Sequence, residues 1–320
     1  MSARIARLLI GLLLAAALPA ALVAQTGALG PDPAEAAPAL RAHAVTVDGH
    51  PLRVWEKSPA QPRARMLLIH GRTWSTRPDF DLQVPGEDVS LMDGLVALGI
   101  ASFGVDLRGY GETPRDESGW LTPERAAADV AGVLEWLARS DPAAPPPYLF
   151  GWSYGAMVAQ LVAQRYPERV AGVILFGYPV RPGIDRDPPP TGTGAPPGEP
   201  TTAEAARSDF LLPDAVDPRV VEAFAAAALA ADPVRADWRE LGQWRALDAA
   251  AVRVPVLLLQ ASHDPLARDD VHRDLFTRLA TDDKAWVVIP GGDHAAFLER
   301  PRGYFLRLIE AFVYRDAPRG

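Results

Sequence analysis

The fold of this chain is decided by Tyr148-Leu149-Phe150-Gly151-Trp152-Ser153-Tyr154-Gly155-Ala156. A short apolar run leads into the motif, as expected of a buried strand, and an apolar run of helical length follows it to Ala163. A strand therefore turns sharply into a helix at Ser153. Gly151 and Gly155 stand where a side chain would collide with the neighbouring elements of so tight a bend, which predicts a G-x-S-x-G nucleophile elbow. Such a bend strains the serine backbone, lifts its hydroxyl above the sheet, and points the positive end of the helix at it.

The rest of the sequence decides whether this motif is functional, because a chain with 26 glycines also produces such a pattern by chance. A serine hydroxyl is a poor nucleophile at neutral pH, so it needs a base and an acid that orients the base. The apolar run 256–261 leads into Asp264, and the run 285–289 leads toward His294. Side chains at the ends of such strands face the crevice of an open sheet. The order Ser153, Asp264, His294 is the order of serine, acid and histidine in one hydrolase architecture.

Alternating strand and helix patterns predict an α/β fold with a doubly wound, mostly parallel sheet, assigned to residues 43–180 and 253–316. Asp48-Gly49 predicts a hairpin turn, and Thr122-Pro123 predicts the start of a helix. Residues 181–252 break the alternation and are interpreted as a helical lid insertion. This insertion is proline-rich to residue 200 and is expected to be helical from Asp217-Pro218 and again over 232–247. The expected core strands are 45–47, 52–55, 66–69, 100–105, 148–152, 170–176, 254–259 and 285–289, and the other expected helices are 89–98, 156–163, 269–280 and 301–314.

These motifs together resemble the α/β-hydrolase superfamily of serine hydrolases, in the branch of esterases, lipases and peptidases with an inserted lid. The resemblance covers nearly everything after Val45. It implies that Ser153 is the nucleophile, Asp264 the acid and His294 the base. It rests on H-G-R-T-W at 70–74, D-L-R-G-Y-G at 106–111, G-W-S-Y-G at 151–155, S-H-D-P at 262–265 and G-G-D-H-A-A-F-L-E-R-P at 291–301.

The resemblance also implies an oxyanion hole made of the backbone N–H groups of Tyr154 and Arg72. The loop departs here from its glycine-rich versions, because Arg72 and Thr73 are bulky. His70 is expected to shape this loop through hydrogen bonds and not to transfer protons.

Other residues compete for the acid and base roles. Asp293 adjoins His294, but neighbouring side chains do not easily adopt the orienting geometry, so we expect it to cap a helix. Asp106 also ends a strand and is the second candidate for the acid, although its neighbour Arg108 suggests a structural ion pair. His263, beside Asp264, is the second candidate for the base.

Composition excludes several functional classes. The chain has 320 residues, enough for one large core with one inserted subdomain. A net charge of −8, without a basic block interleaved with aromatics, disfavours a nucleic-acid partner. The absence of cysteine excludes disulfides, thiolate metal sites and cysteine nucleophiles. With six scattered histidines and no H-E-x-x-H, we expect no metal and no cofactor.

The N-terminus is typical of a targeting segment. Arg4 and Arg7 precede the apolar run 8–24, which predicts a signal peptide cleaved after Ala24. The alternative is an uncleaved membrane anchor over residues 1–24, and this is the only membrane contact expected. Residues 25–42, rich in alanine, proline and glycine, follow as a flexible linker. The catalytic domain is therefore expected to be exported, periplasmic or secreted.

Four tryptophans are candidates for the substrate site: Trp74, Trp152, Trp238 and Trp244 are expected either to wall an apolar pocket or to pack the core. The predicted reaction is hydrolysis of a small carboxylic ester through an acyl-enzyme. Hydrolysis of short or proline-containing peptides, a thioesterase and a cofactor-free haloperoxidase remain open on the same triad, because the fold does not choose among them. A non-catalytic binding protein on this fold is the last alternative, and the sequence does not indicate the oligomeric state.

Overall fold

A computed structural model describes residues 38–179 and 194–316. The predicted targeting segment 1–24, most of the linker 25–42 and the proline-rich residues 181–193 lie outside these ranges. Of the helices in the described ranges, none has the length and apolarity needed to cross a membrane.

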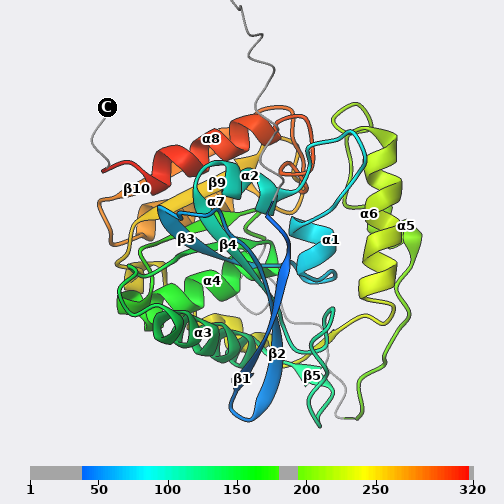
Figure 1. Cartoon of the computed structure of the whole chain (residues 1–320), viewed down its shortest axis with the longest axis horizontal. Helices are drawn as coiled ribbons and strands as arrows, with labels where there is room; N and C mark the ends of the chain where they lie inside the picture. Colours follow the sequence, from blue (N-terminus) through cyan, green and yellow to red (C-terminus); the bar gives the residue numbers. More distant parts are fainter. Residues whose placement is uncertain (1–37, 180–193, 317–320) are drawn as a thin grey trace, which may run out of the picture. The chain divides into compact units, whose positions relative to one another are not determined.

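The main sheet of the described chain has eight strands in the order β1-β2-β4-β3-β6-β7-β9-β10 (Figure 1). β2 pairs antiparallel with β1 and β4, and all other neighbouring strands pair parallel. The predicted mostly parallel sheet is therefore confirmed. The strands are β1 (Arg41–Val47), β2 (His50–Lys57), β3 (Ala64–Ile69), β4 (Ile100–Asp106), β6 (Tyr148–Trp152), β7 (Gly172–Phe176), β9 (Val256–Ala261) and β10 (Lys284–Ile289).

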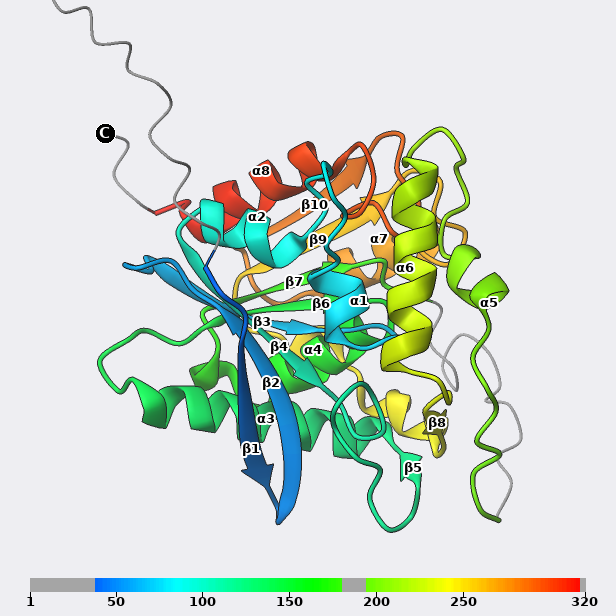
Figure 2. The same cartoon turned by 45° about the vertical axis from the view of Figure 1, so that its right-hand side comes forward.

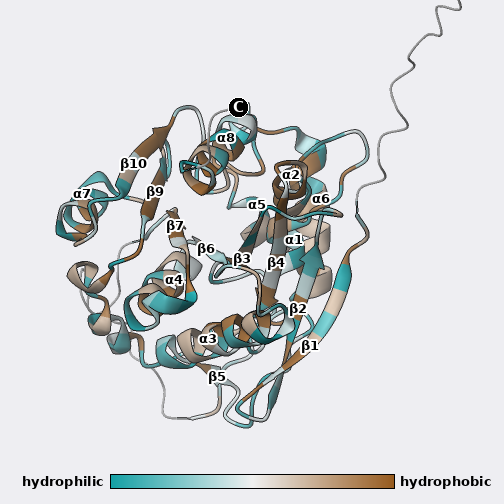
Figure 3. Ribbon diagram, turned by 60° about the vertical axis from the view of Figure 1, so that its left-hand side comes forward, coloured by the Kyte–Doolittle hydropathy of each residue, from teal (hydrophilic) through white to brown (hydrophobic). Residues whose placement is uncertain are grey.

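Helices cover both faces of this sheet (Figures 1 and 2). One face carries α3 (Pro123–Ser140), α4 (Tyr154–Arg165) and α7 (Asp269–Arg278), and the other carries α2 (Leu91–Ala97) and α8 (Arg302–Val313). Because the central strands are covered on both sides, every residue of β4, β7 and β9 is buried. Figure 3 shows the consequence in the sequence, since β9 is largely hydrophobic whereas the edge strand β1 is mixed.

Local signals account for the element boundaries. Asp48 and Gly49 take positive φ values of 50° and 77°, which makes the tight turn of the predicted hairpin. The Thr122 side chain accepts the Arg125 N–H at 3.2 Å, and Pro123 occupies the first turn of α3, as predicted. The other elements outside residues 194–252 are the short α1 (Thr76–Phe80), β5 (Trp120–Leu121) and the 3₁₀ helix η1 (Pro167–Arg169).

The segment predicted to be a lid insertion, which the structure describes over residues 194–252, contains α5 (Ala203–Arg207), α6 (Pro218–Ala231), β8 (Asp237–Trp238) and the 3₁₀ helices η2 (Leu241–Ala246) and η3 (Ala249–Ala251). α6 begins where predicted, with Asp217 as its cap, and packs against α1 (Figure 2).

The helix predicted over 232–247 is wrong. Trp238 pairs with Leu121 in a two-stranded sheet, and Glu240 has a left-handed φ of 55° that ends any helix there. The apolar spacing of three in this stretch is instead the period of a 3₁₀ helix.

Candidate active site

The nucleophile elbow forms where β6 ends and α4 begins. Ser153 is partly exposed and has φ 56° and ψ −121°, outside the regions that a residue with a side chain prefers. The neighbouring backbone explains why both residues that flank the turn, Gly151 and Gly155, are glycines. A Cβ on Gly151 would lie 2.2 Å from the Gly155 carbonyl oxygen, and a Cβ on Gly155 would lie 2.1 Å from the carbonyl oxygen of Ile69. The tight turn therefore holds Ser153 in a strained backbone conformation that leaves its side chain partly exposed.

Asp264 and His294 meet beside this elbow. Both are buried, and His294 Nδ1 lies 2.7 Å from Asp264 Oδ2. The other oxygen of Asp264 accepts the backbone N–H groups of Leu266 at 2.9 Å and Ala267 at 3.3 Å, which fixes the carboxylate. Because the Asp264 bond occupies Nδ1, Nε2 is the ring nitrogen left to accept a proton.

Backbone and side-chain contacts join the turn at Ser153 to the loop that carries His294, residues 290–301, called the histidine loop below. The Ser153 N–H donates to the Phe176 carbonyl at 3.0 Å, and the next residue, Gly177, lies against His294: a Cβ there would be 3.0 Å from His294 Cε1. Trp152 Nε1 donates to the His294 carbonyl at 2.8 Å, and the two rings are 5.2 Å apart. The three predicted residues thus follow the carboxyl ends of β6, β9 and β10 in one part of the sheet.

Carboxylates dominate the electrostatics of His294. Its burial lowers the pKa, but Asp264, Asp209 and Asp293 together outweigh this and hold the His294 pKa above its ordinary value. Asp209 accepts a hydrogen bond from Trp74 Nε1 at 2.8 Å, and burial raises the Asp209 pKa to about 6. Sequence reasoning missed Asp209, because it lies in an irregular loop of the insertion with no pattern to mark it.

The loop predicted to form the oxyanion hole is fixed through its carbonyl groups. His70 Nε2 accepts the Leu107 N–H at 3.1 Å, so Nδ1 carries the proton and donates to the Gly71 carbonyl at 2.9 Å. Burial lowers the pKa of His70 to about 4, which keeps this ring neutral. The Tyr110 hydroxyl donates to the Arg72 carbonyl.

The two backbone amides predicted to bind an oxyanion have no hydrogen-bond acceptor within the described protein. Across the described ranges, neither the Arg72 nor the Tyr154 N–H donates to a protein acceptor. Tyr154 is the first residue of α4, where the helix leaves its N–H groups unpaired. The Arg72 guanidinium lies over the Tyr154 ring, 5.3 Å from its centroid.

All four candidate tryptophans are buried, with exposures between 0 and 4%. Three use their indole N–H within the protein: Trp74 on Asp209, Trp152 on the His294 carbonyl and Trp238 on the Tyr110 hydroxyl at 2.7 Å. Trp244 stacks on Trp238, and both pack against Tyr154. These tryptophans therefore pack against residues of the candidate site, and their role in lining a substrate pocket stays a prediction.

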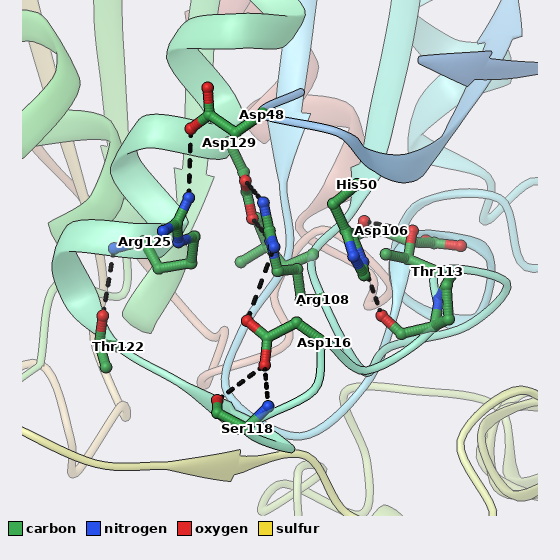
Figure 4. Close-up of polar contacts among 12 residues, drawn as sticks. Asp48, His50, Asp106, Arg108, Thr113, Asp116, Ser118, Thr122, Arg125 and Asp129 are labelled. Atoms are coloured by element: carbon green, nitrogen blue, oxygen red, sulfur yellow. Dashed lines mark hydrogen bonds and ion pairs between the residues drawn. The ribbon is translucent and has the colours of Figure 1, made fainter. Parts of the chain in front are cut away.

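The competing acid and base make other contacts. Asp106 accepts from Trp55 Nε1 at 2.9 Å and from the backbone amides of Thr76 and Glu112. The ion pair expected between Asp106 and Arg108 is wrong, because Arg108 makes a bidentate bond to Asp129 and reaches Asp116 instead (Figure 4). His263 is exposed and bonds through Nδ1 to Ser262 Oγ.

The donor set offers little to a metal. In the part of the chain covered by 38–179 and 194–316, no group of three or more His, Asp or Glu side chains is arranged to hold an ion.

Known proteins resemble this chain in sequence and in fold. The profile of the family described as "Serine aminopeptidase, S33" matches residues 60–301. Pimeloyl-(acyl-carrier protein) methyl ester esterases from two strains of Neisseria meningitidis serogroup B are each 29% identical over 289 residues, covering 82% of this chain and 96% of theirs. Among solved structures, a thermophilic esterase from Thermogutta terrifontis has a TM-score of 0.61 at 22% identity, covering 86% of this chain and 98% of its own. A meta-cleavage product hydrolase from Pseudomonas fluorescens IP01 has a TM-score of 0.60 at 17% identity, covering 86% of this chain and 98% of its own.

Proposed function

The chain belongs to the serine aminopeptidase (S33) family of α/β-hydrolases, and from this premise we propose that it is an exported serine hydrolase that cleaves a carboxylic ester through an acyl-enzyme on Ser153. The observation that carries the proposal is the 2.7 Å bond between Asp264 and His294 beside a strained serine turn. The ester preference is supported by the curated relatives, which are methyl ester esterases.

The proposed reaction uses each group in turn. His294 Nε2 takes the proton of Ser153 as its oxygen attacks the ester carbonyl, and the amides of Tyr154 and Arg72 bind the resulting oxyanion. The imidazolium then gives its proton to the departing alkoxide, which leaves as the alcohol. Water, deprotonated by His294, attacks the acyl-enzyme. The imidazolium then returns this proton to the Ser153 oxygen as the carboxylic acid leaves, which restores the free serine. Asp264 stabilises the imidazolium in both halves and keeps the proton on Nδ1 when the ring is neutral.

The pH dependence follows from the charges around His294. His294 must be neutral to accept the serine proton, and the neighbouring carboxylates raise its pKa. As the pH falls, activity should therefore be lost at a higher pH than with an ordinary histidine. We expect kcat/KM to rise with pH through a midpoint above the ordinary value of 6.5. A pH profile of kcat/KM with an uncharged ester measures this midpoint. A midpoint at or below the ordinary value would contradict the assignment of His294.

A second candidate, an aminopeptidase, is favoured by the acidic groups near the site. Asp209 lies close enough to raise the pKa of His294, and a substrate ammonium group would be attracted by the same charge. Asp79, which accepts the Gly71 N–H at 3.4 Å, does not add to this charge, because burial raises its pKa well above the ordinary value.

One substrate panel separates the two candidates. Purified protein is given p-nitrophenyl esters of increasing acyl length and, in parallel, aminoacyl and prolyl p-nitroanilides. The ester proposal predicts that kcat/KM is highest for an acyl ester. A higher value for an aminoacyl or prolyl amide would replace it with the aminopeptidase, and no hydrolysis of either class would refute both.

Export is proposed from the N-terminal sequence alone. Arg4 and Arg7 followed by the apolar run 8–24 are typical of a signal peptide. Fractionation of the host cell tests this directly. Mature protein starting at Gln25 in the periplasm or medium supports cleavage, full-length protein in membranes supports an anchor, and cytoplasmic protein contradicts export.

A further inference from the structure

The loop that carries His294, residues 290–301 between β10 and α8, contains two buried carboxyl groups that the reaction above does not use. Asp293 is fully buried and Glu299 is 4% exposed. The Asp293 N–H donates to Glu299 Oε2 at 3.0 Å, and Asp293 Oδ1 accepts the Ala295 N–H at 3.0 Å. The second bond resembles the capping role expected from the sequence, but it occupies only one oxygen of the carboxylate.

The other oxygen of Asp293 binds the inserted segment. Oδ2 accepts the N–H groups of Leu211 at 2.5 Å and Leu212 at 3.0 Å. A further bond joins the same two segments, from the Arg300 N–H to the Ala215 carbonyl at 2.8 Å. The insertion is therefore held against the histidine loop at three points, and two of them share the carboxylate next to His294.

The same short stretch of the insertion also reaches the predicted oxyanion loop. Asp209, two residues before Leu211, accepts the Trp74 indole N–H at 2.8 Å. Residues 209–215 thus connect the loop 70–74 to the histidine loop. A displacement of this connection would alter the surroundings of the base and of the oxyanion amides together.

The protonation of the pair favours this arrangement. Glu299 Oε1 has no partner among the described residues, and a charged carboxylate left in that state would be costly. Burial, followed by the Asp293 carboxylate, raises the pKa of Glu299 to about 8, and Asp264 acts in the same direction. Glu299 therefore keeps its proton at pH 7.

We propose that Asp293 is a positioning residue, which docks residues 209–215 onto the histidine loop and places a carboxylate beside His294. The kinetic part of this inference rests on the proposed hydrolase function, whereas the docking part does not. The carboxylates that face His294 are Asp264, Asp209 and Asp293, and all three favour the imidazolium.

The test is Asp293→Asn, which keeps the shape of the side chain and removes its charge. We expect the acid limb of kcat/KM to move to lower pH by about half a unit to one unit, because one of three charges that favour the imidazolium is gone. We also expect kcat to fall roughly tenfold, as for a misplaced catalytic base. Hydrogen exchange at the amides of Leu211 and Leu212 should accelerate, since their acceptor is weakened. Should the asparagine variant not fold, Asp293→Ser, which keeps an oxygen acceptor, replaces it.

Two further variants make the test specific. Asp217→Asn removes a carboxylate from the same segment, which caps α6 through the Arg219 N–H and, among the described residues, makes no hydrogen bond to the histidine loop, so it should leave the acid limb and the exchange at 211–212 unchanged. Glu299→Gln mimics the protonated acid and should differ from the wild type only above about pH 8, where the wild type loses this proton.

The outcomes separate this proposal from the proposed function. An unchanged acid limb together with unchanged exchange at Leu211 and Leu212 in Asp293→Asn would overturn it, as would a Glu299→Gln variant that matches the loss in Asp293→Asn at pH 7. If the wild type hydrolyses no substrate, the proposed function fails, and the exchange together with an NMR titration of His294 still decides the role of Asp293.

Discussion

Ser153→Ala is expected to abolish ester hydrolysis, with kcat falling by roughly 10⁵- to 10⁶-fold, as when the nucleophile of a serine hydrolase triad is removed. The variant has no oxygen to form the acyl-enzyme, while the oxyanion amides remain. The fold should survive, because alanine meets the same strained φ of 56° as serine and removes only one oxygen from a partly exposed position. Steady-state kinetics with the best ester of the panel, together with circular dichroism, measure both expectations.

A matched control distinguishes the nucleophile from a nearby hydroxyl. Ser262 is exposed at the end of β9, two residues before Asp264, and its hydroxyl contacts His263 and the Gly291 N–H. Ser262→Ala should retain activity within a few-fold. Equal losses in the two variants, or substantial activity in Ser153→Ala, would remove Ser153 from the mechanism.

Asp264→Asn is expected to lower kcat by about 10³- to 10⁴-fold while leaving the backbone in place. The reason lies in the two amides of Leu266 and Ala267 that bind Oδ1. An asparagine keeps these bonds only by placing its oxygen there, so its NH₂ group faces His294 Nδ1. The ring must then carry its proton on Nε2, where it cannot accept the serine proton. Steady-state kinetics measure the loss, and NMR of the histidine ring reports the tautomer.

Asp106→Asn serves as the comparison for this prediction, because Asp106 is the other strand-end acid suggested by the sequence. It accepts hydrogen bonds from Trp55 and from the Thr76 and Glu112 amides. Its replacement should therefore lower the melting temperature, while kcat falls much less than in Asp264→Asn. A larger loss of kcat in Asp106→Asn than in Asp264→Asn would exchange the two roles.

Local chemistry explains which parts of the fold could be predicted. The Asp48-Gly49 turn, the Thr122-Pro123 helix start and the glycines of the elbow each carry their signal within a few residues, and each element forms where predicted. The stretch 232–247 misled because a spacing of three suits an α-helix and a 3₁₀ helix almost equally, and a distant strand pairing with Leu121 decided the outcome.

The candidate site divides in the same way. Asp264 and His294 were predicted to meet because both follow the ends of late strands, and the structure pairs them. The partner of Arg108 was not predictable, because Asp129 lies 21 residues away on a helix and competes with a nearer aspartate. The contacts of Asp293 with Leu211 and Leu212 span more than 80 residues and leave no pattern in the sequence.

The most direct test of the central claim is covalent labelling with a fluorophosphonate, followed by mass spectrometry of the digested protein. A serine activated by His294 should form one adduct per chain, on Ser153, and labelling should disappear in a His294→Ala variant that remains folded. An unlabelled wild-type protein, or an adduct on any other residue, would contradict the account.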